Sequence, residues 1–170
     1  MGLHYENLKS DSLELDIDSV KDSKKKNSLK YNLFSEDKKE NIGYIEGYTS
    51  IDNEFISVVR INPDFQNKGF GFEAFNKVFQ ELNTVSNITK ICASWHKDEE
   101  FSECEGGMST NLKTFKEESK ENTNQSECAF KTPTGKWAQK LGFDNCTVLR
   151  DSDTTVEVVF TKGNEKSTKA

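Results

Sequence analysis

The sequence contains few of the residues from which metal sites are built. Among 170 residues it has two histidines and four cysteines, and no two cysteines form a CxxC pair. No zinc-ligand spacing therefore occurs, and we expect no metal site. Cys92 and Cys146 fall in strand-like runs, and we interpret all four cysteines as reduced thiols, with Cys92 a core residue rather than a nucleophile.

Long apolar runs are also absent. No segment approaches the roughly 20 apolar residues that a membrane span requires. Residues 1–10 lack the apolar stretch of a secretory signal. These absences predict a cytoplasmic protein without a membrane partner.

Negative charge is concentrated in one segment. The chain carries a net charge of −6, and residues 98–130 hold nine acidic residues against three lysines, so the remainder is balanced. This distribution argues against nucleic-acid binding, which needs a broad basic surface. It favours a cationic substrate near residues 98–130. The alternative is a solvated helix face and loop.

Hydrophobic periodicity predicts four strands before the first helix. Apolar residues alternate or cluster in the runs 13–18, 29–34, 42–51 and 55–61. Residues 21–28 are lysine-rich and polar, which is typical of a hairpin tip. A helical spacing follows over 69–83, and another strand over 88–95, so that strand, helix and strand form a β-α-β unit.

Helix signals continue after residue 98. Ser109 is placed to cap a helix reaching about Lys120, and Ser126 to cap a short second one. Thr132 precedes Pro133 at the start of a third helix, which Gly142 ends. Two strands over 143–149 and 155–161 close the chain, and we expect one domain over residues 1–170.

One loop of the sequence carries the strongest chemical signal. Between the strand 55–61 and the helix the chain reads Gln66-Asn67-Lys68-Gly69-Phe70-Gly71. Glycine lacks a Cβ, so its backbone can approach a ligand closely. The first turn of a helix exposes unpaired N–H groups at the positive end of its dipole. Loop and helix together predict an anion site suited to a diphosphate.

Two other phosphate-binding motifs do not fit this loop. A P-loop ends in Gly-Lys followed by Ser or Thr, whereas Gly69 is followed by Phe70. A dinucleotide-binding fingerprint needs three glycines and opens a parallel fold. Here two glycines follow four strands whose short turns indicate antiparallel pairing.

The loop resembles the coenzyme A-binding motif of GNAT-type N-acetyltransferases. The matching residues are Ile61-x-Pro63, then Gln66-x-x-Gly69-x-Gly71, then the amphipathic helix. Lys140-Leu141-Gly142-Phe143 is similar to that family's second signature. The resemblance covers roughly residues 13–162, apart from 98–130. It implies an α/β (α+β) fold with a mixed, mostly antiparallel central sheet and flanking helices.

The resemblance also implies a cofactor and a reaction. Backbone amides from Gln66 to Gly71 would bind the diphosphate of acetyl-CoA, and backbone groups of Ile61 would face its pantetheine arm. The acetyl group would pass to a primary amine of a small molecule or protein by direct attack in a ternary complex. The alternative is a catalytically silent acyl-CoA-binding module. A homodimer is common in the family.

The chain departs from the family in three places. The Tyr that often acts as the acid corresponds to Ala138, and Trp137 beside it is no proton donor at neutral pH. The N-terminal helical region is shortened, and residues 98–130 form an insertion that we interpret as a helical lid over the acceptor site. For the base, strand-end positions nominate His96, Glu54 and Ser57. The alternatives for them are a surface histidine and a turn carboxylate.

Overall fold

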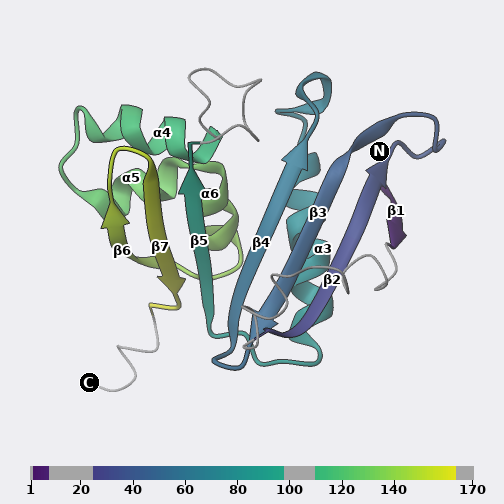
Figure 1. Ribbon diagram of the computed structural model, residues 1–170, viewed down its shortest axis with the longest axis horizontal. Helices are drawn as coiled ribbons and strands as arrows, with labels where there is room; N and C mark the ends of the chain where they lie inside the picture. The colour runs from purple at the N-terminus through teal and green to yellow at the C-terminus, as the bar shows by residue number, and fades with distance from the viewer. Residues whose placement is uncertain (1, 8–24, 98–109, 164–170) are drawn as a thin grey trace. The chain divides into compact units, whose positions relative to one another are not determined.

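The computed structural model describes residues 2–7, 25–97 and 110–163, which belong to two compact units (Figure 1). The first unit comprises residues 1–88 and the second residues 89–170. Each unit contains strands, at least one helix and buried apolar side chains. The single domain expected over residues 1–170 stays a prediction.

The first unit is built on an antiparallel sheet of four strands. In chain order these are β1 (His4–Asn7), β2 (Lys25–Phe34), β3 (Asn41–Ser50) and β4 (Glu54–Ile61), and each pairs with the next. The turn between β3 and β4 places Asn53 at a φ of 64°. Asparagine tolerates this left-handed conformation better than most residues, which explains the predicted turn.

Helix α3 (Phe70–Asn83) packs on this sheet. The Phe55 ring meets the rings of Phe75 and Phe79 edge to face, with centroids 5.3 and 5.4 Å apart. A Cβ on Gly47 would lie 2.6 Å from Cγ1 of Val78, so the helix approaches β3 at a distance that only glycine allows. This contact fixes α3 and, with it, the loop that precedes it.

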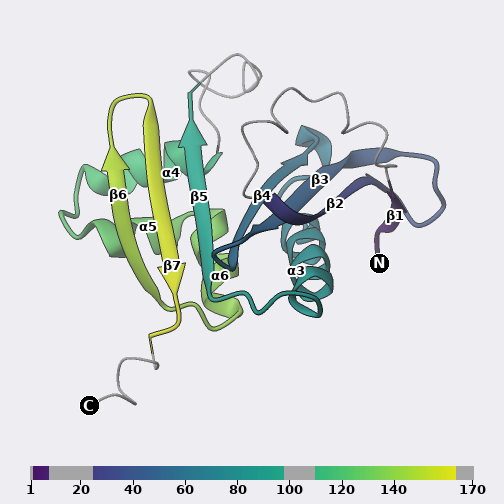
Figure 2. The same ribbon diagram turned by 60° about the horizontal axis from the view of Figure 1, so that its bottom comes forward.

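The second unit contains a three-stranded antiparallel sheet in the order β5-β7-β6. Its strands are β5 (Lys90–His96), β6 (Asn145–Asp151) and β7 (Thr155–Thr161). The helices α4 (Thr110–Ser119), α5 (Gln125–Lys131) and α6 (Pro133–Lys140) lie on one side of this sheet (Figure 2). Between the two layers the Trp95 ring contacts Phe115, and Phe130 contacts Phe160.

Most predicted elements are confirmed, and two predictions of the N-terminal part are not. The strand predicted over 13–18 lies outside the described residues. The hairpin tip predicted over 21–28 is wrong for residues 25–28, because they extend β2 and pair with β3. No strand was predicted at β1, whose four residues pair with β2 from Asn7↔Tyr31 to His4↔Phe34.

The part of segment 98–130 that the structure describes is built into the second unit. Leu112 and Phe115 of α4 are both 0% exposed, and Ser126 of α5 donates a hydrogen bond to the carbonyl of Cys146. Asn124, rather than Ser126, caps α5 by accepting from the N–H of Glu127. Residues 98–109, and the cap predicted at Ser109, lie outside the described residues.

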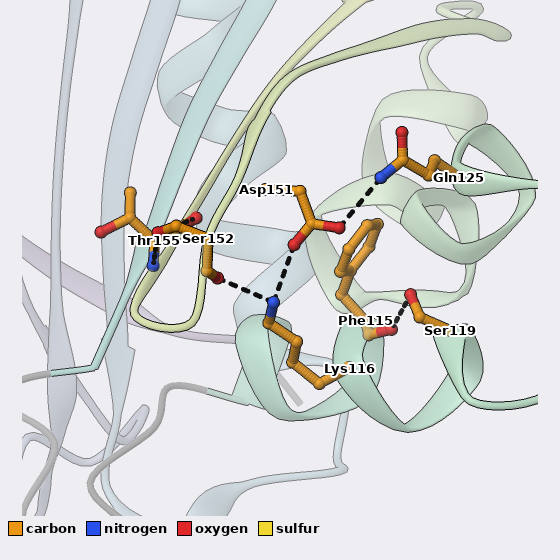
Figure 3. A network of polar contacts seen from close by, with 7 residues as sticks. All are labelled: Phe115, Lys116, Ser119, Gln125, Asp151, Ser152 and Thr155. Carbon is orange, nitrogen blue, oxygen red and sulfur yellow. Dashed lines mark hydrogen bonds and ion pairs between the residues drawn. The ribbon is translucent and has the colours of Figure 1, made fainter. Parts of the chain in front are cut away.

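A polar network attaches α4 and α5 to the turn between β6 and β7 (Figure 3). The Lys116 ammonium lies 2.7 Å from Oδ1 of Asp151 and donates to the carbonyl of Ser152 at 2.8 Å. Gln125 donates to the other carboxylate oxygen of Asp151 at 2.9 Å. Helices α4 and α5 are therefore structural parts of this unit, and their role as a lid over an acceptor stays a prediction.

Candidate functional site

The loop predicted to bind a diphosphate begins where β4 ends, and hydrogen bonds to β3 hold its first residue. Asn62 donates its N–H to the carbonyl of Ile42 at 2.7 Å and its side-chain amide to the carbonyl of Asn41 at 2.8 Å. A single 3-10 turn, η1 (Pro63–Phe65), follows. Proline suits the start of this turn because no N–H is needed there. The loop is thus anchored to the sheet before the glycines begin.

Gln66 closes the loop on itself. Its side-chain amide donates to the carbonyl of Ile61 at 2.8 Å, and its backbone N–H lies 3.3 Å from the carbonyl of Pro63. The Gln at this motif position therefore stabilises the loop through a bond to the end of β4. The carbonyl of Ile61 is engaged by this bond, so the pantetheine contact expected of Ile61 stays a prediction.

Two residues in the left-handed conformation turn the chain into α3. Asn67 has a φ of 63° and Gly69 a φ of 89°, while Lys68 between them is exposed. A Cβ built on Gly69 would meet no heavy atom within 4 Å. Gly69 is therefore required by its backbone angle and leaves open space above the loop.

The amino end of α3 carries no side-chain cap. Gly69 is the capping residue and has no side chain to accept a bond, and the first N–H to bond within the helix is that of Glu73, to the carbonyl of Gly69 at 3.1 Å. The amides of Phe70 and Gly71 thus have no acceptor inside the helix. The open space at Gly69, the two amides without an acceptor inside the helix and the positive end of the helix dipole fit a diphosphate group.

The predicted catalytic residues Glu54 and Ser57 lie on β4 but do not meet. Three positions separate them, so their side chains point to opposite faces of the strand. Glu54 accepts a hydrogen bond from Oγ of Ser50 at 3.2 Å, and its N–H donates to the same oxygen. Glu54 thus takes part in the turn between β3 and β4. Ser57 shares a face with the buried Phe55.

His96 is exposed at the end of β5 in the second unit. Its Nε2 lies 3.1 Å from Oγ of Ser94, which points from the same face of the strand. The sequence analysis missed Ser94, although its spacing of two from His96 on a strand was a signal for it. Together they form a Ser–His pair in contact with solvent.

The position where the family often has a tyrosine that acts as the acid carries no polar side chain here. Ala138 lies in α6 with 0% exposure, and its carbonyl accepts from the N–H of Phe143 at 2.9 Å. Among the cysteines, burial raises the pKa of Cys146 to about 12. Its thiol is therefore protonated at neutral pH and unsuited to act as a nucleophile.

Two other kinds of feature do not occur within residues 2–7, 25–97 and 110–163. No group of three or more His, Cys, Asp and Glu side chains there could hold a metal ion. None of the helices in those ranges is long and apolar enough to cross a membrane.

Comparison with known proteins identifies the fold. No profile of a known protein family matches the sequence, and no curated protein matches it. Solved structures do match. A spermidine N-acetyltransferase chimera that includes the Vibrio cholerae enzyme is 13% identical, with 97% of this chain and 98% of that one covered at a TM-score of 0.50.

Two further matching structures contain CoA or acetyl coenzyme A. A Bacillus subtilis acetyltransferase in complex with CoA is 10% identical, with 94% of this chain and 97% of that one covered at a TM-score of 0.47. A Bacillus anthracis protein assigned as a streptothricin acetyltransferase, in complex with acetyl coenzyme A, is 13% identical at a TM-score of 0.45. The match covers 81% of this chain and 63% of that protein. The fold is that of the GNAT-type acetyltransferases, as predicted.

Proposed function

We propose that this chain is an acetyl-CoA-dependent N-acetyltransferase that transfers an acetyl group to a primary amine. The observation that carries the proposal is the uncapped amino end of α3, entered through Gly69 at a φ of 89°. The fold of the GNAT-type acetyltransferases supports it independently.

The loop from Gln66 to Gly71 supplies the cofactor site in this proposal. Backbone amides at the start of α3 bind the diphosphate of acetyl-CoA, because they lack partners within the helix and lie at the positive end of its dipole. The bonds of Asn62 and Gln66 hold the loop in place before the cofactor arrives. Such preorganisation lowers the entropy lost on binding.

The chemical step is direct attack by a neutral amine within a ternary complex. The amine nitrogen forms a bond to the thioester carbonyl carbon, and the carbon–sulfur bond breaks to release the thiolate of CoA. A base must first remove the proton of the ammonium. We assign this role to His96, because a neutral imidazole has a ring nitrogen that can accept a proton, and because the ring is exposed at the end of β5 with Nε2 3.1 Å from Oγ of Ser94. Glu54 and Ser57 are the other candidates.

The proposal assigns no acid, because Ala138 occupies the position where the family often has tyrosine. Departure of the thiolate does not require one, since a thiol is much more acidic than an alcohol. We expect the thiolate to take its proton from water or from the protonated base.

Thiol release measured with acetyl-CoA and a panel of amines tests the proposal. The panel consists of spermidine, a primary amine that carries no other charged group, and a lysine-containing peptide. We expect release with at least one of them, and His96→Gln to lower kcat about a hundredfold at pH 7. The loss should shrink at high pH, where the amine is already neutral. His4→Gln is the matched control, since His4 is the other histidine and belongs to β1.

A silent acyl-CoA-binding module is the second candidate, and Ala138 is the observation that favours it. If CoA stabilises the protein against heat but no amine leads to thiol release, the binding module is the correct function. Thiol release with a different acyl-CoA would instead indicate another donor on the same scaffold. Absence of any CoA binding would overturn both candidates.

We further propose that the acceptor is a cationic amine. Exposed carboxylates occur on and after α4 at Glu117, Glu121 and Glu127, and a polyamine has the opposite charge. Removing the whole segment 98–130 would also delete the buried Leu112 and Phe115 and so unfold the second unit. The cleaner test replaces the three exposed carboxylates by glutamine. KM should rise for spermidine and stay the same for the primary amine that carries no other charged group, while the Kd of CoA is unchanged.

A further inference from the structure

Glu73 is the acidic residue in the first turn of α3, and the amino-terminal segment holds its carboxylate. Oε2 of Glu73 accepts a hydrogen bond from the backbone N–H of Leu3 at 3.0 Å. The neighbouring N–H of Gly2 donates to a different carboxylate, that of Glu36, at 2.9 Å. Leu3 immediately precedes β1, so pairing of β1 with β2 places this donor next to the helix.

A second residue of β1 lies within range of the same carboxylate. Burial, followed by the negative charge of Glu73, raises the pKa of the Tyr5 phenol. The Lys77 ammonium stands 4.8 Å from the centre of the Tyr5 ring, one helical turn further along α3. The carboxylate of Glu73 is thus directed toward β1.

A carboxylate at this position has an alternative place to bind. Side chains on a helix lean toward its amino end, so Glu73 covers the turn that contains Phe70 and Gly71. The positive end of a helix attracts a carboxylate as well as a diphosphate. Gly69 has no side chain, so the capping residue offers no side-chain acceptor that would compete with Glu73 for these amides. A released Glu73 would compete with the cofactor by charge and by hydrogen bonding.

We propose that the amino-terminal segment, residues 2–7, sets the affinity for coenzyme A by holding the Glu73 carboxylate away from the amino end of α3. The proposal rests on the proposed function, because it concerns the same diphosphate site. Glu73 is a positioning residue in it, since it touches neither the acetyl group nor the amine. All the residues involved belong to the first unit.

A double-mutant cycle in the full-length chain tests the coupling between Leu3 and Glu73. Leu3→Pro removes the N–H that holds the carboxylate and keeps the chain length. Leu3→Ala keeps the N–H and controls for the lost side chain. Glu73→Gln removes the charge but can still accept the bond. Titration calorimetry with CoA measures Kd for each variant, and circular dichroism confirms that each variant is folded.

We expect Leu3→Pro to raise the Kd of CoA about twofold to fivefold, the range set by one charge at a helix end. Added salt should reduce this loss. In the Glu73→Gln background, Leu3→Pro should leave Kd unchanged. Glu36→Ala is a matched control, because it frees the neighbouring N–H of Gly2 but puts no charge near α3, and it should leave Kd unchanged.

The outcomes separate this inference from the proposed function. If Leu3→Pro raises Kd equally in both backgrounds, or if Glu36→Ala has the same effect, loosening of β1 rather than Glu73 is responsible and the inference is overturned. The inference is also overturned if none of the variants changes the Kd of CoA. If Leu3→Pro unfolds the chain, Glu73→Gln decides alone: it should lower the Kd of CoA, because it removes the competing charge, and an unchanged or raised Kd overturns the inference. If the unaltered chain binds no CoA, the proposed function itself has failed.

Discussion

The helices α3 and α6 begin in opposite ways. At the start of α6, Oγ1 of Thr132 accepts the N–H of Gly135 at 3.0 Å, and Thr132 is 0% exposed. At the start of α3, Gly69 is exposed and offers no side chain. The amino end of α6 is satisfied by its own sequence and lies in the core, whereas that of α3 remains open to solvent.

This difference separates a structural helix end from one available to a ligand. Helix α5 follows the pattern of α6, since Asn124 accepts the N–H of Glu127. Both α5 and α6 gain stability from their caps, which contribute about 1 kcal/mol each. Helix α3 forgoes a cap, and burial of Phe75, Val78 and Phe79 stabilises it instead. The open end is then free to bind an anion.

The largest effect should come from removing the buried cap of α6. Thr132→Val keeps the shape but leaves the N–H of Gly135 without its partner, and the lost bond to the carbonyl of Ala129 adds to the cost. We expect the free energy of unfolding to fall by about 2–3 kcal/mol in denaturant titrations. Thr147→Val, at an exposed site on β6, should change it by less than about 0.5 kcal/mol. A similar effect at both sites would refute the role of the cap.

The second prediction compares two glycines with the same backbone requirement. Gly69 and Gly142 have φ values of 89° and 96°, and neither has a heavy atom within 4 Å of an added Cβ. Alanine at either site should cost about 1 kcal/mol of stability. Gly69→Ala should in addition raise the Kd of CoA about tenfold, because the Cβ blocks close approach of the diphosphate. Equal Kd values for the two variants in calorimetry would contradict the proposed site.

The third prediction concerns the bond that closes the loop. Gln66→Ala removes the donor to the Ile61 carbonyl and should weaken CoA binding about fivefold, since one such bond contributes about 1 kcal/mol. Gln80→Ala is the control, because Gln80 is an exposed residue of α3 whose side-chain amide donates to Oδ1 of Asn76, one turn earlier in the same helix. Fluorescence or calorimetric titration with CoA measures both. An unchanged Kd for Gln66→Ala would mean that the loop does not need this bond.

The smallest effect should come from the network of Figure 3. Lys116→Met removes the ion pair with Asp151. The side chain of Lys116 is 29% exposed and that of Asp151 is 30% exposed. We expect a loss of about 0.5–1 kcal/mol in the free energy of unfolding. The Kd of CoA should not change, because the network stabilises the second unit. Altered CoA binding would show that α4 acts on the cofactor site.

Local signals predicted much of this comparison from the sequence. Thr132 before Pro133 and Gly142 after the helix define α6, and each acts on the helix end next to it, Thr132 through its side-chain oxygen and Gly142 through its backbone angle. The loop from Gln66 to Gly71 was predicted for the same reason, because a site made of backbone groups depends on glycine positions in sequence. The family resemblance added the cofactor.

Features that depend on contacts distant in sequence were not predicted. Residues 25–28 are polar and resemble a hairpin tip, yet pairing with β3 extends them as strand. Ser126 was expected to cap α5, but its hydroxyl donates to Cys146 of β6 and Asn124 takes its place. The bond from Leu3 to Glu73 spans 70 positions, and no local pattern indicates it.

An NMR titration of the ¹⁵N-labelled chain tests the central claim most directly, namely that the open end of α3 binds the diphosphate of coenzyme A. CoA should shift the amide signals of Gly69, Phe70 and Gly71 strongly, and those of Glu127 and Gly135 at the capped helices little. Pantetheine, which lacks the diphosphate, should leave all five signals in place. CoA binding that shifts other amides and leaves Gly69, Phe70 and Gly71 unchanged would contradict the account.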